Sequence, residues 1–301
     1  MRNVSFDGNL RPSSLHPQDE TLSSAEQREK SPNHRGHRWG SLSSWGTRLL
    51  VLCAVFGLFC WGKGYASSRG DWGWLVGSAK PGRVAVIELF TSEGCSSCPP
   101  ADEVLAKIVS LSKRHKLPVY GLSFHVDYWN NLGWTDPFSR RHFSQRQSEY
   151  AQLLGGTSVY TPQMIVNGRW GFVGSRHWTA QKILRRALSS PSQGHLALRA
   201  KVKGSKISAR FLAKDFPMGT HLRVALVEQK QRVYVPRGEN AGKTLHHVNV
   251  VRVFRDVELR GKTKGALELT IPRRFRRRGA SLVGYLQQRD GRILNAARLS
   301  L

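Results

Sequence analysis

The sequence predicts an α/β domain with a partly parallel sheet over residues 80–194, followed by a β-rich, antiparallel sandwich-like domain over residues 195–301. In the first region, strand-like apolar runs alternate with amphipathic helical segments, which requires crossover connections and a sheet covered on both faces. In the second region, short runs alternate apolar residues with Lys or Arg, as strands half buried in a sandwich do. The length of 301 residues suits two domains of ordinary size.

The N-terminal segment reads as an extension followed by an export signal. Residues 1–48 are rich in Ser, Arg, Gly, Pro and His and show no apolar periodicity, which predicts disorder. The uncharged residues 49–62 would form a helix of roughly 21 Å, shorter than a bilayer core of about 30 Å. Small residues follow near Ala66, so residues 49–66 are interpreted as a signal-peptide apolar region and cleavage site. An uncleaved membrane anchor at residues 49–62 and a start site placed too far upstream stay open.

The cysteines point to redox chemistry in an exported chain. All three interpretations of the N-terminal segment place the rest of the protein in the periplasm or outside the cell. Of the four cysteines, Cys53 and Cys60 lie in the apolar segment, so the exported part keeps Cys95 and Cys98. A disulfide framework for stability would use more pairs at longer spacing. A single close pair therefore predicts a redox role.

The positive charge is concentrated in the second region. The formal net charge is +27, and +17 of it falls on residues 195–301. Much of this charge is expected on the solvent face of strands, and the run at residues 273–278 is interpreted as a solvated connection. A weak contact with an anionic surface stays open. No nucleic-acid motif accompanies the charge, so we expect no nucleic-acid partner.

The elements of the first domain are expected in the order β, α, β, α, β, β, α. The β-branched run "RVAVIELFTS" predicts a buried parallel strand. Helical spacing of apolar residues predicts a helix over 99–113, with Asp102 and Glu103 in its first turn, where they suit the helix dipole. The remaining predicted elements are a strand at 117–126, a helix at 137–156, a hairpin at 159–174 turning at Asn167-Gly168, and a helix at 178–190.

The second domain is expected to contain strands joined by polar turns. The predicted strands are residues 195–202, 206–213, 221–229, 249–259, 266–271, 280–288 and 293–301. Between the third and fourth of them lies the polar loop "RGENAGKTLHHVN". In one interpretation its Glu239, Asn240, His246 and His247 lean over the redox cleft. The other interpretation, which we favour, is a turn whose glycines serve only the backbone geometry.

The pair Cys95 and Cys98 lies immediately before the helix that begins at Pro99. Two intervening residues let both sulfurs meet across a helix-opening turn, as an exchangeable disulfide requires. Cys95 is expected to be exposed and nucleophilic, because backbone N–H groups at a helix opening lower the pKa of a thiol. Cys98 would then resolve the mixed disulfide.

A second group of candidates follows the strand at 117–126. His125 and Asp127 share a strand face, and Tyr128, Trp129 and Trp134 follow at its carboxyl end, the ligand side of open α/β sheets. An aromatic wall beside the dithiol would bind an extended substrate segment. In the alternative interpretation, the aromatic residues cap a core and a His–Asp hydrogen bond holds the loop.

With a CxxC pair at the mouth of the first strand and Thr161-Pro162 opening the hairpin, this arrangement resembles the thioredoxin fold. In that family a proline at this place is cis and lies against the dithiol, which implies a site role for Pro162 and substrate contact for Thr161. Glu88 occupies roughly the place of the buried acid that thioredoxins use as a proton relay. A carboxylate paired with a nearby base is the alternative for Glu88.

Five stretches carry a more specific resemblance: "IELFTSEGCSSCPPAD", "FHVDYWNNLGWTDPF", "RQSEY", "VYTPQMIVNG" and "RGENAGKTLHHVNVVR". Together they are similar to the secreted thioredoxin-like proteins of domain-of-unknown-function family 1223. The resemblance covers about residues 83–300. It implies a secreted thioredoxin-like domain followed by a β-rich domain, and it implies no established substrate.

The leading functional hypothesis is an extracytoplasmic thiol–disulfide oxidoreductase that acts on protein or small-molecule thiols and disulfides and needs no cofactor or resident metal. A second hypothesis is a Cu(I) carrier with Cys95, Cys98 and His125 as soft ligands, although three methionines supply no methionine-rich tract. A third hypothesis is a non-catalytic binding protein that keeps a structural disulfide and holds its partner through the β-rich domain.

Overall fold

The computed structural model describes residues 72–78 and 80–301. The predicted extension at residues 1–48 and the predicted signal segment at 49–66 lie outside the described residues. Within the described part, no helix has the length and apolar character needed to cross a bilayer.

The described chain contains four helices and eleven strands. The helices are α1 (Gly73–Ser78), α2 (Pro99–Arg114), α3 (Arg141–Leu153) and α4 (His177–Ala187). The strands are β1 (Ala85–Thr91), β2 (Val119–His125), β3 (Gln163–Val166), β4 (Trp170–Val173), β5 (His195–Lys203), β6 (Lys206–Lys214), β7 (His221–Tyr234), β8 (Thr244–Glu258), β9 (Lys264–Thr270), β10 (Ser281–Gln287) and β11 (Ile293–Ser300). Strands β7 and β8 reach further toward each other than predicted, so the loop between them shortens to residues 235–243.

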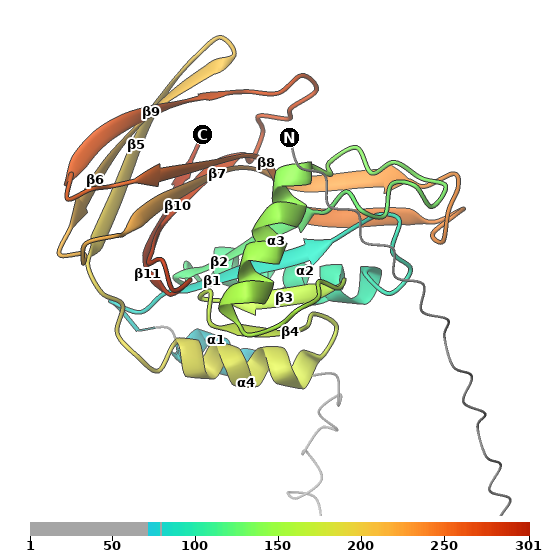
Figure 1. The fold of residues 1–301 in the computed structure, drawn as a ribbon, viewed down its shortest axis with the longest axis horizontal. Helices are drawn as coiled ribbons and strands as arrows, with labels where there is room; N and C mark the ends of the chain where they lie inside the picture. Colours follow the sequence, from blue (N-terminus) through green and yellow to red (C-terminus); the bar gives the residue numbers. More distant parts are fainter. Residues whose placement is uncertain (1–71, 79) are drawn as a thin grey trace, which may run out of the picture. The chain divides into compact units, whose positions relative to one another are not determined.

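The strands form two sheets, which make the protein β-rich with a large mixed sheet and few helices (Figure 1). The larger sheet has eight strands in the order β11-β10-β7-β8-β2-β1-β3-β4, and the smaller has three in the order β5-β6-β9. Parallel pairing joins β1 to β2, and β2 meets β8 in parallel at Ser123 and Val250. The larger sheet thus combines strands from both predicted domains. The boundary between residues 194 and 195 stays a prediction.

Helices cover both faces of the β1 region, as the alternation of strands and helices predicts. All seven residues of β1 are buried, which explains its continuous apolar character. Because alternate strand residues point to opposite faces, Ile87 packs in the core with α2 and α4. Phe90 packs on the other face with Phe143 and Tyr150 of α3. The carboxyl end of β1 is thereby held between two cores.

A third core lies between the two sheets. Strand β6 alternates exposed and buried residues along its nine positions, with Ile207 and Phe211 turned inward. They belong to one apolar cluster with Leu222 and Leu226 of β7. The cationic residues of β6 occupy its exposed positions, so part of the positive charge is the solvent face of a sheet.

Candidate functional site

Cys95 and Cys98 close the turn between β1 and α2. Their sulfurs are 2.27 Å apart, and Cys98 is the N-cap residue of α2. The Ser97 hydroxyl lies 3.3 Å from the Cys95 sulfur. Both cysteines are 0% exposed, so the expected exposure of Cys95 is wrong. The physical reason is a segment distant in sequence that packs over the turn.

Residues 235–243, which we call the covering loop, hold the backbone of the CxxC turn. The Ser96 N–H donates to the Glu239 carboxylate at 2.9 Å. The Asn240 side-chain amide donates to the carbonyls of Glu93 and Cys95, both at 2.9 Å. Asn240 is itself fully buried. Of the two interpretations of this loop, contact with the cysteine turn is the one that the structure supports.

One glycine of the covering loop has a packing reason beyond backbone freedom. Gly238 has φ +81°, and a Cβ there would lie 3.1 Å from the Leu132 carbonyl and 3.3 Å from the Trp134 Cβ. The loop therefore packs against the segment after β2 at the same time as it covers the cysteines. The favoured interpretation, glycines for geometry alone, missed this close approach.

Beside the cysteine turn lies a buried group that we call the acid–histidine cluster: Glu93, Asp102, His125, Asp136 and His247. His247 Nε2 lies 3.3 Å from Glu93 Oε1, and His247 Nδ1 lies 3.7 Å from Asp102 Oδ1. His125 Nδ1 lies 2.6 Å from Asp136 Oδ2. The two imidazole rings pack edge to face with centroids 4.7 Å apart. Two histidines, each beside its own carboxylate partners, thus contact each other in the interior.

The pKa values of the cluster follow from the competition between burial and charge. Burial alone would lower the pKa of His247, but the carboxylates of Asp102 and Glu93 outweigh it and raise that pKa to about 10. Burial would raise the pKa of Asp136, but the charge of His125 and hydrogen bonds hold it below its usual value. His247 is therefore an imidazolium at neutral pH, and its contacts are ion pairs longer than good hydrogen bonds.

The predicted His–Asp pairing involves a different aspartate. His125 is fully buried and pairs with Asp136, whereas the Asp127 carboxylate accepts a hydrogen bond from Ser144 on α3. Asp136 reaches His125 because its other oxygen accepts from the Phe138 N–H, which turns the chain back toward β2. This supports the alternative in which a His–Asp hydrogen bond holds the loop.

The predicted aromatic residues divide between the cysteine turn and the surface. Trp129 Nε1 donates to Thr161 Oγ1 at 2.8 Å, and a Cβ at Gly94 would lie 3.2 Å from the Trp129 Cβ. Trp129 therefore connects the cysteine turn with the Thr161-Pro162 segment, whose peptide bond is cis. The Trp134 ring nitrogen donates to Glu93 Oε2 at 2.8 Å. Tyr128 is 38% exposed and is the predicted wall residue most open to solvent.

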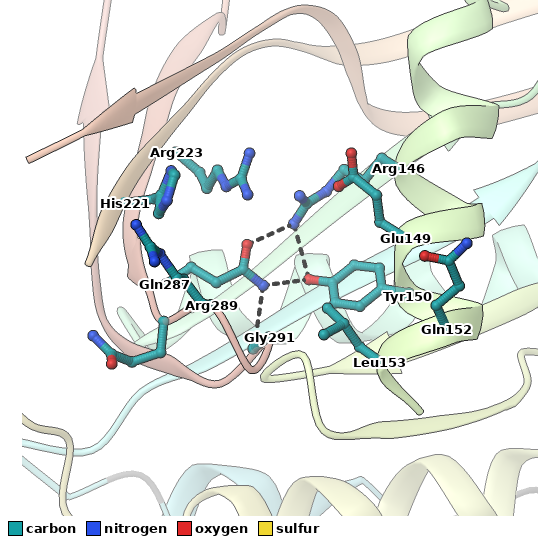
Figure 2. A pocket seen from close by; sticks show the side chains of 11 residues that line it. Arg146, Glu149, Tyr150, Gln152, Leu153, His221, Arg223, Gln287, Arg289 and Gly291 are labelled. Atoms are coloured by element: carbon teal, nitrogen blue, oxygen red, sulfur yellow. Dashed lines mark hydrogen bonds between the residues drawn. The ribbon is translucent and has the colours of Figure 1, made fainter. Parts of the chain in front are cut away.

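Glu88 lies in a separate buried network on the α3 face of the sheet. Its carboxylate accepts from Arg146 Nε at 2.6 Å and Nη2 at 2.8 Å, and from the Tyr150 hydroxyl at 2.7 Å. Figure 2 shows Arg146, Tyr150 and Gln287 turned toward one another at the edge of a pocket of about 390 Å³. The contacts of Glu88 are those of the alternative interpretation, a carboxylate paired with a base.

Sequence reasoning missed several residues of the site. The sequence indicates only a helix-dipole role for Asp102, although this residue follows Cys98 by four positions, a spacing that makes neighbours on a helix surface. Glu93 was overlooked two positions before Cys95. Asp136 carried a turn signal in "TDPF". His247, by contrast, is named in the sequence, but only in the interpretation of the loop that is not favoured, because its neighbours come from distant parts of the chain.

The geometry does not favour the Cu(I) hypothesis. The sulfurs of Cys95 and Cys98 lie at disulfide distance, and His125 Nδ1 faces Asp136. No three or more His, Cys, Asp or Glu side chains gather in a metal-binding arrangement in residues 72–78 and 80–301.

Comparison with solved structures finds a similar protein from Agrobacterium tumefaciens. The crystal structure of an Agrobacterium tumefaciens protein, from a structural genomics consortium, has 29% sequence identity and a TM-score of 0.54. The match covers 73% of this chain and 96% of that chain. An endonuclease/exonuclease/phosphatase from Beutenbergia cavernae has 18% identity over 36% of this chain and 24% of its own. Its TM-score of 0.18 carries no argument.

No curated protein matches the chain. The family model described as "Protein of unknown function (DUF1223)" matches residues 86–287, which is more than half of the chain. The matched range begins in β1 and ends in β10, so it includes the cysteine turn, the acid–histidine cluster and the covering loop. The resemblance predicted from the five sequence stretches is confirmed, and the chain belongs to the DUF1223 family.

Proposed function

We propose that this protein is an extracytoplasmic thiol–disulfide oxidoreductase with a thioredoxin-like α/β arrangement around Cys95 and Cys98. The observation that carries the proposal is the CxxC pair at disulfide distance, placed beside a buried imidazolium and its two carboxylates. Burying such titratable groups costs stability, and functional sites are where proteins accept that cost. The partners would be thiols or disulfides of proteins or small molecules.

In the reducing direction, the Cys95 thiolate attacks one sulfur of a partner disulfide, and the other partner sulfur leaves as a thiolate that takes up a proton. Cys98, once it has lost its proton, attacks the Cys95 sulfur of the mixed disulfide. This second attack releases the remaining partner sulfur and closes the Cys95–Cys98 bond. Two electrons pass from the dithiol to the partner disulfide, and the reverse sequence oxidises a partner dithiol.

We infer that Asp102 accepts the Cys98 proton. It follows Cys98 by one helical turn, and its N–H donates to the Cys98 carbonyl at 3.2 Å. The Asp102 carboxylate accepts from the Thr91 hydroxyl at 3.2 Å and faces His247 on its other side. The imidazolium charge of His247 offsets the negative charge of the Asp102 carboxylate in this buried position.

Access to the sulfurs requires the covering loop to move. Because both cysteines are fully buried, a partner sulfur reaches Cys95 only after the contacts of Glu239 and Asn240 open. Trp129 and Thr161, which lie next to the turn, would then line the uncovered surface. The exported location rests on residues 49–66 of the sequence and is part of the proposal.

A structural disulfide in a binding protein is the second candidate, and the burial of both cysteines favours it. The equilibrium reduction potential, measured in glutathione buffers, separates the two. A value near about −120 to −180 mV supports disulfide donation or isomerisation, and one near about −270 mV supports reduction. A value below about −300 mV would favour the structural bridge.

A further inference from the structure

We propose that a groove between α2, β7 and the β9–β10 connection binds a small anionic amphiphile, with one phosphate- or carboxylate-type group and an attached apolar portion. The groove follows the C-terminal half of α2, whereas the cysteines precede the start of that helix. Its volume is about 880 Å³, within the range of small-molecule sites. The inference is independent of the proposed redox activity.

The groove gathers cations from three parts of the chain. They are Lys113, Arg114, Lys230, Arg276 and Arg278. None of these five side chains forms an ion pair with a carboxylate of the described residues. An anion placed among them would meet several unpaired charges at once, and it would be partly shielded from solvent by the groove walls.

The carboxylate among the lining residues does not oppose an anionic ligand. Glu228 is 1% exposed, and its oxygens accept from the Arg252 guanidinium and from the Arg276 N–H. Its charge is therefore matched by Arg252 inside the protein. The same contact fixes the backbone of the β9–β10 connection at Arg276, which positions the neighbouring cations at the groove.

The apolar lining indicates that the ligand is an amphiphile. Ala106 and Val109 of α2 and Val248 of β8 contribute to the lining, and Val248 packs against the core behind it. Apolar surface of this kind gains about 25 cal/mol per Å² when a ligand removes it from water. An inorganic anion would leave that gain unused, and a flat membrane surface would not enter a recessed groove.

Local structure accounts for only part of this charge. Lys113 and Arg114 lie in the last turn of α2, where cations suit the helix dipole. Lys230 lies on β7, and Arg276 and Arg278 lie on the β9–β10 connection, where no such local reason applies. These three meet the helix only through tertiary packing.

The test is titration calorimetry of the full chain with dodecyl phosphate below its micelle concentration. We expect saturable binding of one probe per chain, at least about tenfold weakened in Lys230→Gln/Arg278→Gln. The matched control is Arg273→Gln/Arg274→Gln, which removes equal charge from the β9–β10 connection outside the groove and should keep the affinity within about twofold. All four substituted side chains are exposed, so both variants are expected to fold.

Four outcomes would overturn the proposal. One is the absence of saturable binding, and another is an equal loss of affinity in both double variants, which indicates diffuse charge. A third is inorganic phosphate binding as tightly as dodecyl phosphate, because the apolar portion would then contribute nothing. The fourth is binding to mixed phosphatidylglycerol and phosphatidylcholine vesicles without binding of the soluble probe, which would identify a membrane-contact surface instead.

Discussion

Substitution of Asn240 by alanine tests whether the covering loop controls access to the disulfide. The Asn240 amide donates to two backbone carbonyls, both at 2.9 Å, from a fully buried position. Each lost hydrogen bond costs about 1 kcal/mol, and a carbonyl left buried without a partner costs more. We therefore expect closure of the loop to weaken by about 2–4 kcal/mol. Because about 1.4 kcal/mol corresponds to a tenfold change in an equilibrium constant, the population of molecules with an open covering loop rises roughly 30-fold to 700-fold.

The assay is the rate at which excess dithiothreitol reduces Cys95–Cys98 in the native protein, followed by thiol labelling and mass spectrometry. If reduction proceeds through the open loop, the rate in Asn240→Ala rises by the same factor as the open population. The matched control is Asn167→Gly, which removes an amide that bonds Val86 N–H and Val84 carbonyl near the start of β1. Glycine suits the positive φ of 48° at that position.

An unchanged reduction rate in Asn240→Ala would refute the reasoning, because the covering loop would then not limit access. An equal rise in both variants would also refute it, since reduction would then follow global unfolding. A rise confined to Asn240→Ala is the expected result.

Three further predictions concern buried charged groups. The pKa of His247 is raised from 6.5 to about 10, so its charge stabilises the fold fully below pH 6.5 and this stability is lost as the pH rises through about 10. The free energy of urea unfolding should fall more steeply over this range in wild type than in His247→Gln, and equal slopes would contradict the assignment. Glu88→Gln leaves the buried Arg146 unpaired and should lower the free energy of unfolding by about 3–5 kcal/mol. The pH dependence of the reduction potential should stay unchanged, whereas an altered dependence would restore Glu88 as a proton relay. Asp102→Asn should slow the release of glutathione from a Cys95 mixed disulfide by about tenfold or more at pH 7. The difference should narrow as the pH rises and hydroxide takes over removal of the thiol proton, and a gap that stays constant with pH would exclude proton transfer as its cause.

Local patterns in the sequence were enough to predict those helices, strands and turns that depend only on residues close together along the chain. The buried strand β1, the helix after the cysteines and the turn at Asn167-Gly168 each carry their own periodicity or turn residues. The partner of His125 could not be predicted from such local patterns. The two-residue period of a strand places Asp127 on the same face as His125, but the structure pairs His125 with Asp136. A turn after β2 brings Asp136 back to the His125 imidazole, and the residue pattern of a strand does not predict such a turn.

The sequence by itself determined the CxxC pair, its place before a helix and the family to which the chain belongs, because these depend on residue types at fixed short spacing. The tertiary structure alone decided that the cysteines are buried. Residues 235–243 come from a strand connection about 140 positions away, and they cover the turn through contacts such as Asn240 to Cys95. The charge state of His247 was decided in the same way, since a histidine from β8 meets Glu93 and Asp102 only after the chain folds.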